Sequence, residues 1–546
     1  LTVVLAIGMQ RILRRNGLVR SLTSAETLGG VTTICVDKTG TLTEGKMRVL
    51  DVIGEKEELA KQSVLANDLD DPIVIAAFEW GRTFVKDYIQ EHARLDSIPF
   101  SAKERFFASL NKWEKDKNII FVNGAPDYLL KWSDLEKDKN KEVLEKIEEL
   151  TTQGKRVVGM ARKIVPSSKK SLSTDDVKDG LEWIGLLSFS DPVRSGVKEA
   201  LEKARKAGID IIVITGDYPS TAEAVLSEIG MPVSQGEVIL GEDLEKLGVE
   251  ELSKKVKKIK LFARTSPDQK LRIVEALRKN GEVVAMMGDG VNDAPAINKA
   301  DIGIVVGQAT DVARESADLV LLNSNFATIV ASVEEGRGIF ENIRKIILYL
   351  LSDAFGEIIT VIGAIIVGLP LPITAVQILC INLVSDGFPA LSLTIDPKRK
   401  GIMDDPPRAP DEKVVTSWMK TLIATVSIAS GLVALVFFFY VLKIEGDVKL
   451  ARSVAFLTLG INSLVYVFSV RNLTVPFWKD SLFGNRWLVA AVIAGFGLQA
   501  IPFITAPARA FFDVSVLPPS YWVIALALSF LMFIIVEVSK YFFRPR

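Results

Sequence analysis

Histidine and cysteine are almost missing from this chain of 546 residues, which contains one histidine, His92, and two cysteines, Cys35 and Cys380. The two cysteines lie in segments of opposite character, so a disulfide framework is not supported, and both are expected to be buried small hydrophobic residues. So few soft ligands cannot assemble a zinc or haem site, which excludes transition-metal catalysis. Any metal bound by this chain is expected to have oxygen ligands.

An excess of charge of either sign is also missing, because 66 basic and 67 acidic residues leave a formal net charge of -1. Without a basic patch, no nucleic-acid partner is expected. The average hides two unlike halves: charged residues are dense from Leu1 to about Glu335, whereas long apolar runs recur from about Ile346 onward. A chain of this length exceeds one hydrophobic core, so several domains are expected.

The second half predicts a membrane domain with six helices in a lipid bilayer. Each apolar stretch is long enough to span about 30 Å of hydrocarbon as a helix of roughly 20 residues. Lysine and arginine cluster in alternate connections and at the C-terminus, so the positive-inside rule predicts that these connections and the soluble half are cytoplasmic. The expected location is the plasma membrane of a prokaryote. The six stretches are residues 346–368, 371–393, 418–442, 451–470, 487–505 and 521–539.

The opening run from Leu1 to Leu13 is apolar and meets Arg11, Arg14 and Arg15. This pattern predicts the end of another helix that leaves the bilayer on the cytoplasmic side. A buried helix of a soluble domain is the alternative.

The first half predicts an α/β fold with a doubly wound parallel sheet. Three segments, VTTICVDKTGT, IDIIVITGD and EVVAMMGDG, each join an uninterrupted apolar run to an acidic residue and a glycine turn, as buried parallel strands do. Helical stretches alternate with them, so the chemistry is expected at the carboxyl ends of the strands, where the three motifs converge. The stretch from Arg48 to Trp183 has its own strands and helices and is expected to be an inserted domain.

Asp37, in the string DKTGTLT, is the candidate nucleophile. A carboxylate at the tip of a strand beside a small, hydroxyl-rich turn suits an aspartyl-phosphate mechanism, which needs an exposed nucleophile surrounded by backbone donors. Taken alone, an aspartate at a strand end is more often a turn residue or a helix cap. The full seven-residue string favours catalysis, because it resembles the phosphorylation motif of P-type ATPases.

Three further motifs follow in the order of that family: TGD at residues 215–217, FARTSPDQK ending at Lys270, and GDGVNDAPA from Gly288. The chain is therefore identified as a member of the P-type cation-transporting ATPases, in the calcium-pump-like P2 branch. The resemblance implies an α/β haloacid-dehalogenase-like doubly wound phosphorylation domain with an inserted α+β nucleotide-binding domain, followed by an all-α transmembrane helix bundle. It also implies earlier membrane helices and an actuator domain before Leu1.

The resemblance further implies where the domains lie. Residues 1–20 would form the end of a transmembrane helix and its cytoplasmic extension. The phosphorylation domain would comprise residues 21–47 and 185–335, the nucleotide-binding domain residues 48–184, and the membrane domain residues 336–546.

The resemblance assigns roles to the motif residues. Asp37, the carbonyl of Thr39 and Asp289 would bind Mg²⁺, which bridges the γ-phosphate and offsets the charge that repels the attacking carboxylate. Acidic residues gathered around one phosphate repel it without a divalent cation, so the physical chemistry requires Mg²⁺ as well. Lys270 and Thr215 would neutralise and orient the transferred phosphoryl oxygens. The remaining catalytic positions are Lys38, Gly216, Asp217, Asn292 and Asp293.

ATP is the expected substrate of the inserted stretch. Phe100 matches the aromatic residue that stacks on adenine in the family, with a core aromatic as the alternative, and Arg156 matches the arginine that reaches the phosphates. Two positions depart from the family: Asn123 replaces a lysine, and Val74 replaces a frequent glutamate. Arg105 could supply some of the missing charge. The expected nucleotide-binding residues are Phe100, Arg105, Gly124, Arg156, Thr215, Gly216, Asp217 and Lys270.

Ionisable residues inside a membrane span are costly, so Glu357 and Asp386 are candidate ligands of a transported cation. Asn382 and Asp386 are four residues apart on one helix face, with Ser385 beside them. The segment Gly387–Pro389 is expected to break this helix and free backbone carbonyls. Together these groups predict an oxygen-lined site for a hard cation.

The string NLVSDGFPA resembles the calcium-pump branch, where this helix supplies an asparagine and an aspartate, and Glu357 matches a ligand of the preceding helix. Ca²⁺ is therefore favoured, with H⁺, Na⁺, Mg²⁺ and Mn²⁺ as alternatives. Ala354 replaces an asparagine of two-site calcium pumps, and Asn462 and Ser463 stand where these pumps have a glutamate, so one of the two sites is expected to be weakened or absent. Asp353 is interpreted as a helix-end charge at the membrane surface.

The sequence thus predicts ATP hydrolysis through an aspartyl-phosphate, coupled to cation transport. A haloacid-dehalogenase-type phosphatase is a rival hypothesis, opposed by the six apolar spans. A pseudo-pump that binds nucleotide without turnover is a second rival, opposed by Asp37, Lys270 and Asp289.

Overall fold

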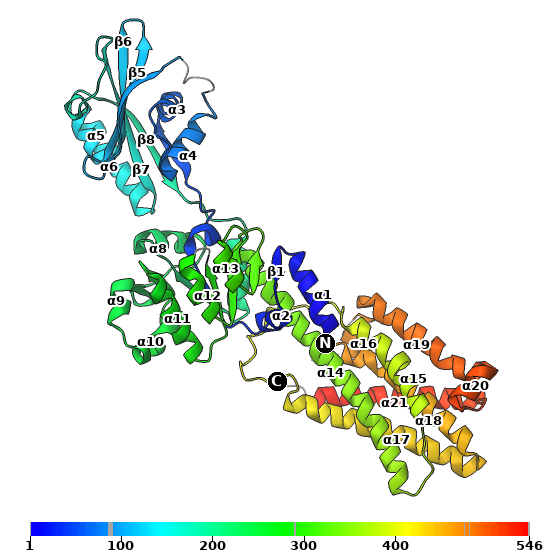
Figure 1. Cartoon of the computed structure of the whole chain (residues 1–546). Coiled ribbons are helices and arrows are strands. Elements are labelled where there is room, and N and C mark those ends of the chain that lie inside the picture. The colour runs from blue at the N-terminus through cyan, green and yellow to red at the C-terminus, as the bar shows by residue number, and fades with distance from the viewer. Residues whose placement is uncertain (1, 86–90, 289–290, 474, 480, 544–546) are drawn as a thin grey trace.

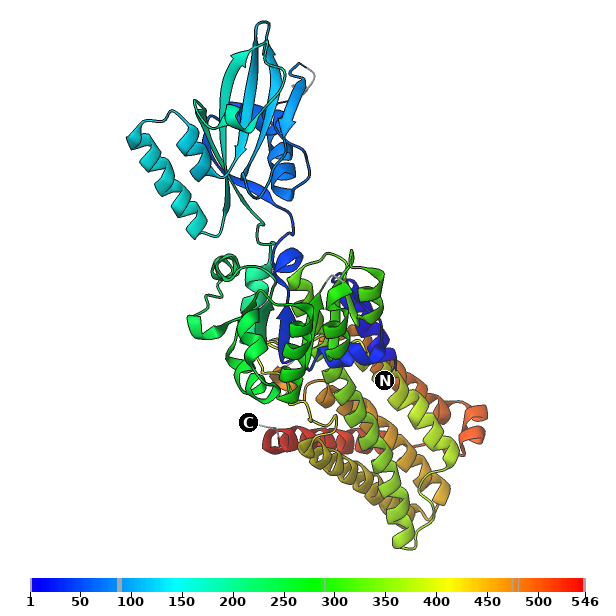
Figure 2. The same cartoon turned by 60° about the vertical axis from the view of Figure 1, so that its left-hand side comes forward.

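The computed structural model is an elongated molecule with three parts in a row (Figure 1). One end is a six-stranded sheet with helices, the middle is an eight-stranded sheet with helices, and the other end is a bundle of long helices. The view turned by 60° has the same order (Figure 2). The structure describes residues 2–85, 91–288, 291–473, 475–479 and 481–543.

The middle sheet has the strand order β1-β14-β13-β12-β2-β9-β11-β10, and its pairs are parallel except for β1 with β14. β2 is buried along its whole length, as its uninterrupted apolar sequence predicts. It lies between β9 and β12, with Val36 opposite Val213 and Cys35 opposite Met286. The carboxyl ends of these three strands therefore meet at one edge. The strands are β1 (Gly17–Val19), β2 (Thr33–Val36), β9 (Asp210–Ile214), β10 (Val238–Leu240), β11 (Leu261–Ala263), β12 (Val284–Gly288), β13 (Ile302–Val306) and β14 (Leu319–Leu321).

Amphipathic helices cover this sheet. In α7, for example, Val197, Ala200, Leu201 and Ala204 are buried, and their spacing of three and four residues forms one apolar face. The helical segments of this part are α2 (Leu22–Leu28), η1 (Lys38–Leu42), α7 (Val197–Lys206), α8 (Pro219–Glu228), η3 (Gln235–Glu237), α9 (Gly241–Lys246), α10 (Val249–Lys255), η4 (Val256–Lys258), α11 (Pro267–Lys279), η5 (Val291–Asp293), α12 (Ala294–Lys299) and α13 (Asp311–Ser316).

The six-stranded sheet has the order β3-β8-β7-β6-β5-β4, and all its pairs are antiparallel. The chain leaves the middle sheet after β2 and returns to it at β9, so this sheet is inserted between two neighbouring strands of the other one. Its elements are β3 (Arg48–Gly54), α3 (Lys56–Leu65), α4 (Pro72–Gly81), β4 (Arg94–Ile98), β5 (Phe106–Glu114), β6 (Lys117–Gly124), α5 (Pro126–Trp132), α6 (Lys137–Thr152), β7 (Arg156–Pro166), η2 (Thr174–Val177) and β8 (Glu182–Ser190).

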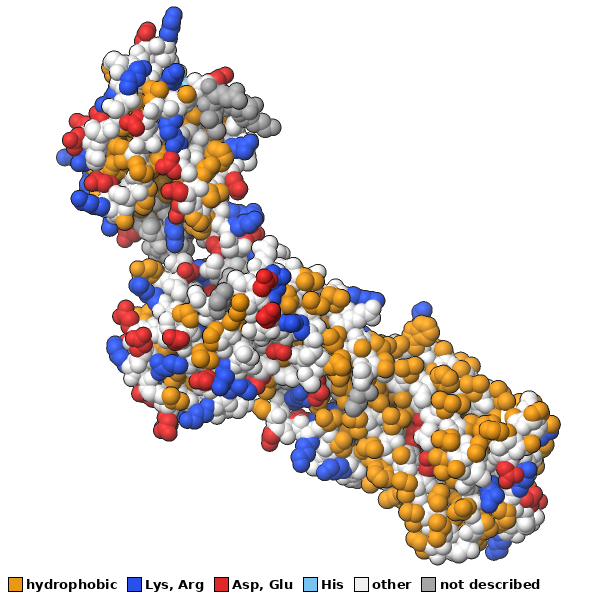
Figure 3. Space-filling view, viewed as in Figure 1, with side chains coloured by type: hydrophobic (Ala, Val, Ile, Leu, Met, Phe, Trp, Pro, Cys, Tyr) orange, Lys and Arg blue, Asp and Glu red, His pale blue; other side chains and the backbone are white. Residues whose placement is uncertain are grey.

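The helix bundle contains, among the described residues, six helices that are long and apolar enough to cross a membrane, which confirms the number expected from the sequence. Figure 3 shows hydrophobic side chains over the surface of this end and charged ones over the sheets. Cys380, expected to be buried, is half-buried here. The bundle comprises α1 (Thr2–Leu13), α14 (Phe326–Ile366), α15 (Ala375–Cys380), η6 (Ile381–Asp386), α16 (Gly387–Leu393), α17 (Ser417–Glu445), α18 (Val448–Val470), η7 (Phe477–Lys479), η8 (Leu482–Gly484), α19 (Arg486–Ile504), α20 (Ala506–Phe512) and α21 (Pro519–Phe543).

Helix α14 belongs to two parts of the molecule at once. It is 41 residues long, about 60 Å at 1.5 Å per residue, and it contacts α2 and α7 near one end and α17 and α18 near the other. Gly336 lies against the end of α2 so closely that a Cβ atom there would be 2.5 Å from the backbone nitrogen of Gly29. Because backbone meets backbone at this point, α14 is fixed to the middle part.

A buried ion-pair cluster around Asp396 holds the bundle together next to the sheets. The Asp396 carboxylate is 2% exposed and accepts hydrogen bonds from Lys345 at 2.8 Å, Arg471 at 3.1 Å and Asn485 at 3.0 Å. Its backbone carbonyl accepts another from the Asn342 amide at 3.0 Å. One carboxylate thus links α14, α18 and α19 to the segment that follows α16.

Asp396→Ala is expected to destabilise the bundle strongly. The change leaves two buried cations without their shared partner, a loss that costs about 3–5 kcal/mol. The measurement is the temperature at which detergent-solubilised protein loses its monodisperse size-exclusion peak. Asp513→Asn is the control, because Asp513 pairs with Lys449 at an exposed position. Equal transition temperatures for the two variants would contradict a structural role for the Asp396 cluster.

Candidate functional site

Asp37 stands where the sequence motif predicts, directly after β2 at the carboxyl edge of the middle sheet. The turn that follows it is η1, in which Thr39 is extended and Gly40 has a φ of 75°. Glycine tolerates this left-handed conformation without cost, and a Cβ atom on Gly40 would meet no atom within 4 Å. The turn therefore leaves the space beside Asp37 open.

Lys270 brings two of the motifs together. Its ammonium group lies 2.8 Å from Asp37 Oδ2 and 2.9 Å from Asp293 Oδ1. A capping box between Ser266 and Gln269 begins α11 and fixes Lys270 in its first turns. Burial disfavours the ammonium charge, but attraction to Asp37 and Asp293 outweighs it and raises the pKa of Lys270 above its usual value. Lys270 is therefore a permanent cation beside the candidate nucleophile.

The TGD motif follows β9 and lies beside the same turn. Thr215 is buried, its hydroxyl accepts a hydrogen bond from the backbone of Asp217 at 3.2 Å, and its carbonyl accepts one from the Thr265 hydroxyl at 3.1 Å. A Cβ atom on Gly216 would meet nothing within 4 Å. Lys38 is 5% exposed and forms an ion pair with Asp217, which ties the Asp37 turn to this loop.

The GDGVND motif follows β12. A Cβ atom on Gly288 would lie 2.5 Å from the Asp293 side chain, so only glycine lets this aspartate pack against the strand end and reach Lys270. Asn292 is exposed at the same edge. Asp289, the third expected Mg²⁺ ligand, lies outside the described residues.

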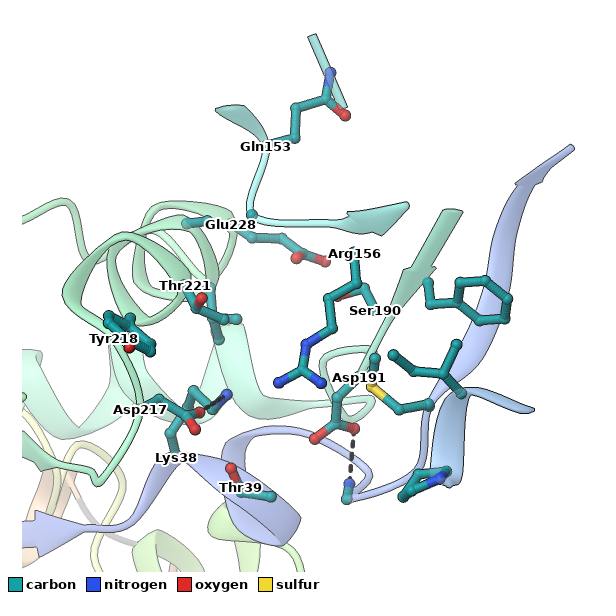
Figure 4. A pocket seen from close by; sticks show the side chains of 18 of the residues that line it. Lys38, Thr39, Gln153, Arg156, Ser190, Asp191, Asp217, Tyr218, Thr221 and Glu228 are labelled. Carbon is teal, nitrogen blue, oxygen red and sulfur yellow. Dashed lines mark hydrogen bonds and ion pairs between the residues drawn. The ribbon is translucent and has the colours of Figure 1, made fainter. Parts of the chain in front are cut away.

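A cleft of about 300 Å³ opens between the two sheets next to these loops. Lys38, Thr39 and Asp217 line one side, and Arg156, from the first residue of β7, lines the other. Figure 4 shows the Arg156 side chain pointing into the cleft toward Thr39 and the Lys38–Asp217 pair. A cationic fork thus faces the loops that carry the nucleophile, as phosphate binding requires.

Phe100, Arg105 and Gly124, which were also expected at the nucleotide, belong to the part with the six-stranded sheet and do not line this cleft. Gly124 ends β6, where a Cβ atom would be 2.6 Å from the Arg105 carbonyl oxygen. Arg105 has a φ of 59°, and its guanidinium carbon lies 5.6 Å from the centre of the Tyr128 ring. Phe100 is 60% exposed, so the alternative of a core aromatic is wrong.

Asn123, which departs from the family pattern, has a structural role. Its amide oxygen accepts a hydrogen bond from Gln62 at 2.7 Å, and its amide nitrogen donates to the Ala66 carbonyl at 2.7 Å. Gln62 is buried and also donates to the carbonyls of Val122 and Ala161. The two ends of the Asn123 amide are thus used inside the protein, where they hold α3 against β6.

The expected membrane ligands gather where α14 meets η6. Glu357, Ser385 and Asp386 are buried, whereas Asn382 is exposed. The expected helix break at Gly387–Pro389 is wrong: η6 is a π-helical turn, and the chain continues from it into α16. π-turns within helices are frequent at functional sites.

The Ser385 carbonyl, next to Asp386, is bonded to side chains rather than free. Pro389 has no N–H to donate to the carbonyl of Ser385, four residues earlier. The Tyr349 hydroxyl donates to this carbonyl instead, at 2.9 Å. The proline therefore removes one hydrogen-bond donor of the helix without ending the helix, and a side chain takes its place.

The interpretation of Asp353 as a charge at the membrane surface is wrong. Asp353 lies inside α14 and is 6% exposed. Its Oδ2 is 3.0 Å from the Ser463 hydroxyl and 3.2 Å from the Tyr466 hydroxyl, and Ser463 also contacts Asp386. The sequence does contain a sign of this buried position: Asp353 and Glu357 are four residues apart, so their carboxylates lie on the same face of the helix.

Asn462 and Ser463, the two residues of α18 that stand where related pumps have a glutamate, contact different neighbours in the structure. Ser463 faces the carboxylates, whereas the Asn462 amide donates to Ser430 at 3.1 Å and accepts a hydrogen bond from Ser529 at 2.6 Å. Asn462 therefore joins α17, α18 and α21 rather than serving the carboxylates. A residue missed in the sequence, Gln499, lies 3.3 Å from the Ser385 hydroxyl.

Comparison with known proteins agrees with this arrangement. The family model described as "haloacid dehalogenase-like hydrolase" matches residues 31–301, and the one described as "Cation transporting ATPase, C-terminus" matches residues 370–542. The "Probable cation-transporting ATPase F" of Mycobacterium tuberculosis is 33% identical over 100% of this chain and 67% of its own length. The chain belongs to the P-type cation-transporting ATPases.

Other relatives of this ATPase chain are named for calcium. The "Calcium-transporting ATPase 1" of Bacillus cereus is 35% identical over 99% of this chain, and the "Calcium-transporting ATPase" of Bacillus subtilis is 32% identical over 97% of it. The chain spans 66% of the length of each of these two relatives. The fold class expected from the sequence is confirmed, since haloacid-dehalogenase-like α/β sheets precede six membrane-capable helices of a multi-pass membrane protein.

In the variant Asp293→Asn of this ATPase, Lys270 is expected to react faster with acetic anhydride at alkaline pH. Removing one of the two carboxylates lowers the raised pKa of Lys270, so more of the amine is neutral and nucleophilic. Mass spectrometry of the acetylated peptides measures the rate. Asp191→Asn is the control, because Asp191 lies in the same cleft but bonds to Thr43 and Gly45. Unchanged labelling in Asp293→Asn would refute the electrostatic coupling.

Proposed function

We propose that the protein containing this chain hydrolyses ATP through a phosphoryl intermediate on Asp37 and couples the reaction to transport of a cation, Ca²⁺ first of all, across a membrane. The observation that carries the proposal is the continuity of α14. This helix is fixed to the part that holds Asp37 and also bears the buried carboxylates Asp353 and Glu357. One rigid element therefore connects the candidate catalytic edge with the candidate cation site.

The proposed first step transfers the γ-phosphoryl group of ATP. A carboxylate oxygen of Asp37 forms a bond to phosphorus while the bond to the bridging oxygen breaks, and ADP leaves. Lys270 stabilises the added negative charge from 2.8 Å away, and Lys38 holds Asp217 in the neighbouring loop. Attack of water on the aspartyl-phosphate then releases phosphate and restores the carboxylate.

Mg²⁺ fits the donors at this edge, because the Asp37 carboxylate and the Thr39 carbonyl are oxygen groups of the kind it prefers. We assign these two residues, with Asp289, to hold the ion, which supplies positive charge against the phosphate oxygens. Arg156 faces the same edge across the cleft and is assigned to the ATP phosphates. Phe100, Arg105 and Gly124 are assigned to the nucleoside end.

Ca²⁺ is the favoured cargo because the oxygen groups of Glu357, Asn382, Ser385 and Asp386 suit a hard cation and because two relatives are named calcium-transporting ATPases. H⁺, Na⁺, Mg²⁺ and Mn²⁺ are the alternatives. The soluble part is proposed to be cytoplasmic, in a prokaryotic plasma membrane. Supporting this orientation, basic side chains lie at the end of the bundle next to the sheets. They include Arg344, Lys345, Lys398, Arg399 and Arg471.

Phosphorylation from radiolabelled ATP tests the function. The natural protein that contains this chain, in its membranes with Mg²⁺, is expected to form an acid-stable, hydroxylamine-sensitive label that Ca²⁺ increases relative to a chelator. In Asp37→Asn the label is expected to fall to background, because an amide cannot act as the nucleophile. Asp311→Asn, an exposed aspartate of α13, is the control and should label normally.

The outcomes separate the hypotheses. Labelling that does not depend on Ca²⁺ would reject the calcium assignment and keep the pump. No labelling in the unmodified protein would favour a non-catalytic relative. Phosphate release without a covalent label would favour a phosphatase.

Arg156→Ala is expected to weaken ATP binding about 10–100-fold, because a charge-assisted hydrogen bond contributes about 1.5–3 kcal/mol. Displacement of a fluorescent nucleotide measures the affinity. Lys163→Ala is the matched control, since Lys163 lies on the same strand and pairs with exposed Asp179. A loss of equal size in both variants would contradict a direct contact of Arg156 with ATP.

A further inference from the structure

Among the described residues, the buried acidic side chains of the helix bundle are of two kinds, and the first kind has a basic partner. Asp396 lies 2.8 Å from Lys345 and 3.1 Å from Arg471, and the Glu537 carboxylate lies 2.8 Å from Lys540. All five side chains are less than 9% exposed. Here the attraction between opposite charges offsets the cost of removing each charge from water.

The second kind has no such partner. Asp353, Glu357 and Asp386 are 6%, 7% and 1% exposed, and within the described part of the chain no lysine or arginine forms an ion pair with any of them. Their negative charges interact with one another, because Asp386 lies close enough to act on both of the others. Three carboxylates in one buried space call for a positive charge from outside the chain.

Ser463 lies between two of these carboxylates and cannot satisfy both. Its hydroxyl oxygen is 3.0 Å from Asp353 Oδ2, contacts Asp386 Oδ1 and is 2.6 Å from the Tyr349 hydroxyl. A serine hydroxyl has one hydrogen to donate. Because Tyr349 donates its hydrogen to the Ser385 carbonyl, the single hydrogen of Ser463 is all that this serine offers to the two carboxylates, and one of them faces the serine oxygen without a hydrogen from it. Asp353 and Asp386 are thus held next to each other by one shared contact.

Glu357 supplies an independent sign of a missing ligand. Its Oε1 is buried and has no hydrogen-bond partner among the described residues. The carboxylate interacts with the Asn382 amide and with Asp386, so it belongs to the same group. The described residues contain no three acidic, histidine or cysteine side chains already arranged around one metal position. Binding would therefore bring Glu357 closer to the other two carboxylates.

We propose that Asp353 is a direct ligand of the transported cation, the third carboxylate of its site with Glu357 and Asp386, and that the site takes a divalent cation. The proposal rests on the transport function proposed above. When all three carboxylates are ionised, a monovalent ion leaves two uncompensated negative charges in this buried space, whereas a divalent ion leaves one. Ser463 and Tyr466 position the Asp353 carboxylate for this contact.

Equilibrium binding of radioactive Ca²⁺ tests the proposal on the natural membrane protein that contains this chain. Asp353→Asn is expected to weaken Ca²⁺ binding at least tenfold, on the order expected when one of three charged ligands is lost. Asparagine has nearly the shape of aspartate and still accepts a hydrogen bond, so the contacts with Ser463 and Tyr466 can remain. Mn²⁺ and Na⁺ serve as competitors, and Mn²⁺ should compete far better than Na⁺.

Glu445→Gln is the matched control, because Glu445 also carries a carboxylate on a long helix but bonds to Tyr521 away from the cluster. Its Ca²⁺ binding should be unchanged. Nucleotide binding and a monodisperse size-exclusion peak show that each variant is folded. If Asp353→Asn does not fold, Asp353→Glu is used, and a changed ratio of Ca²⁺ to Mn²⁺ affinity is expected.

The results also separate this proposal from the one on which it rests. Normal Ca²⁺ binding by folded Asp353→Asn, with a wild-type protein that binds Ca²⁺ and is phosphorylated, would overturn the role of Asp353 alone. Effective competition by Na⁺ would overturn the divalent assignment. A wild-type protein that neither binds a divalent cation nor is phosphorylated would overturn the transport function itself.

Discussion

The contact between Gly336 and Gly29 is the constraint on which the coupling of the two ends of this molecule depends. At this point the backbone of α14 lies against the end of α2 with no side chain between them, so neither residue can be larger without moving a backbone. α14 then runs without interruption to Ile366 inside the bundle. A displacement of the middle sheet is therefore transmitted to Asp353 and Glu357 by a helix, whose hydrogen-bonded backbone resists bending, rather than by a flexible linker. The candidate catalytic edge and the buried carboxylates are thus connected by one continuous helix.

Among the described residues, buried carboxylates differ in whether a basic side chain of the chain lies beside them. Where a buried carboxylate has a structural role, a cation of the chain accompanies it, as Lys345 and Arg471 accompany Asp396. At the catalytic edge Lys270 lies between Asp37 and Asp293, and it keeps the two acids close to each other before any nucleotide arrives. In the membrane cluster no such cation is present among the described residues. The difference distinguishes carboxylates whose charge is offset by a basic side chain of the chain from Asp353, Glu357 and Asp386, whose charge is not.

Features of the molecule that are encoded by a fixed motif or by a long apolar run could be predicted from the sequence. The motif strings led to Asp37 and Lys270, and six apolar stretches led to six helices, because a membrane span needs a length that chance rarely supplies. Features that depend on contacts between distant segments could not be predicted. The prediction that Asp353 lies at the membrane surface is wrong because its partner Ser463 is 110 residues away in the sequence, and their contact forms only when α14 packs against α18. Asn123 was interpreted as a lost ligand because its bond to Gln62 becomes visible only when α3 packs against β6.

The effect of Pro389 links these contacts to α14. A proline in a helix removes one hydrogen bond, and here the Tyr349 hydroxyl of α14 replaces it at the Ser385 carbonyl. Tyr466 of α18 in turn donates to the Tyr349 carbonyl. These two hydrogen bonds connect η6, α14 and α18 beside the buried carboxylates and fix the position of Tyr349 relative to Ser385. The Ser463 hydroxyl of α18 also lies 3.4 Å from the Ser385 carbonyl oxygen, so both neighbouring helices contact this carbonyl.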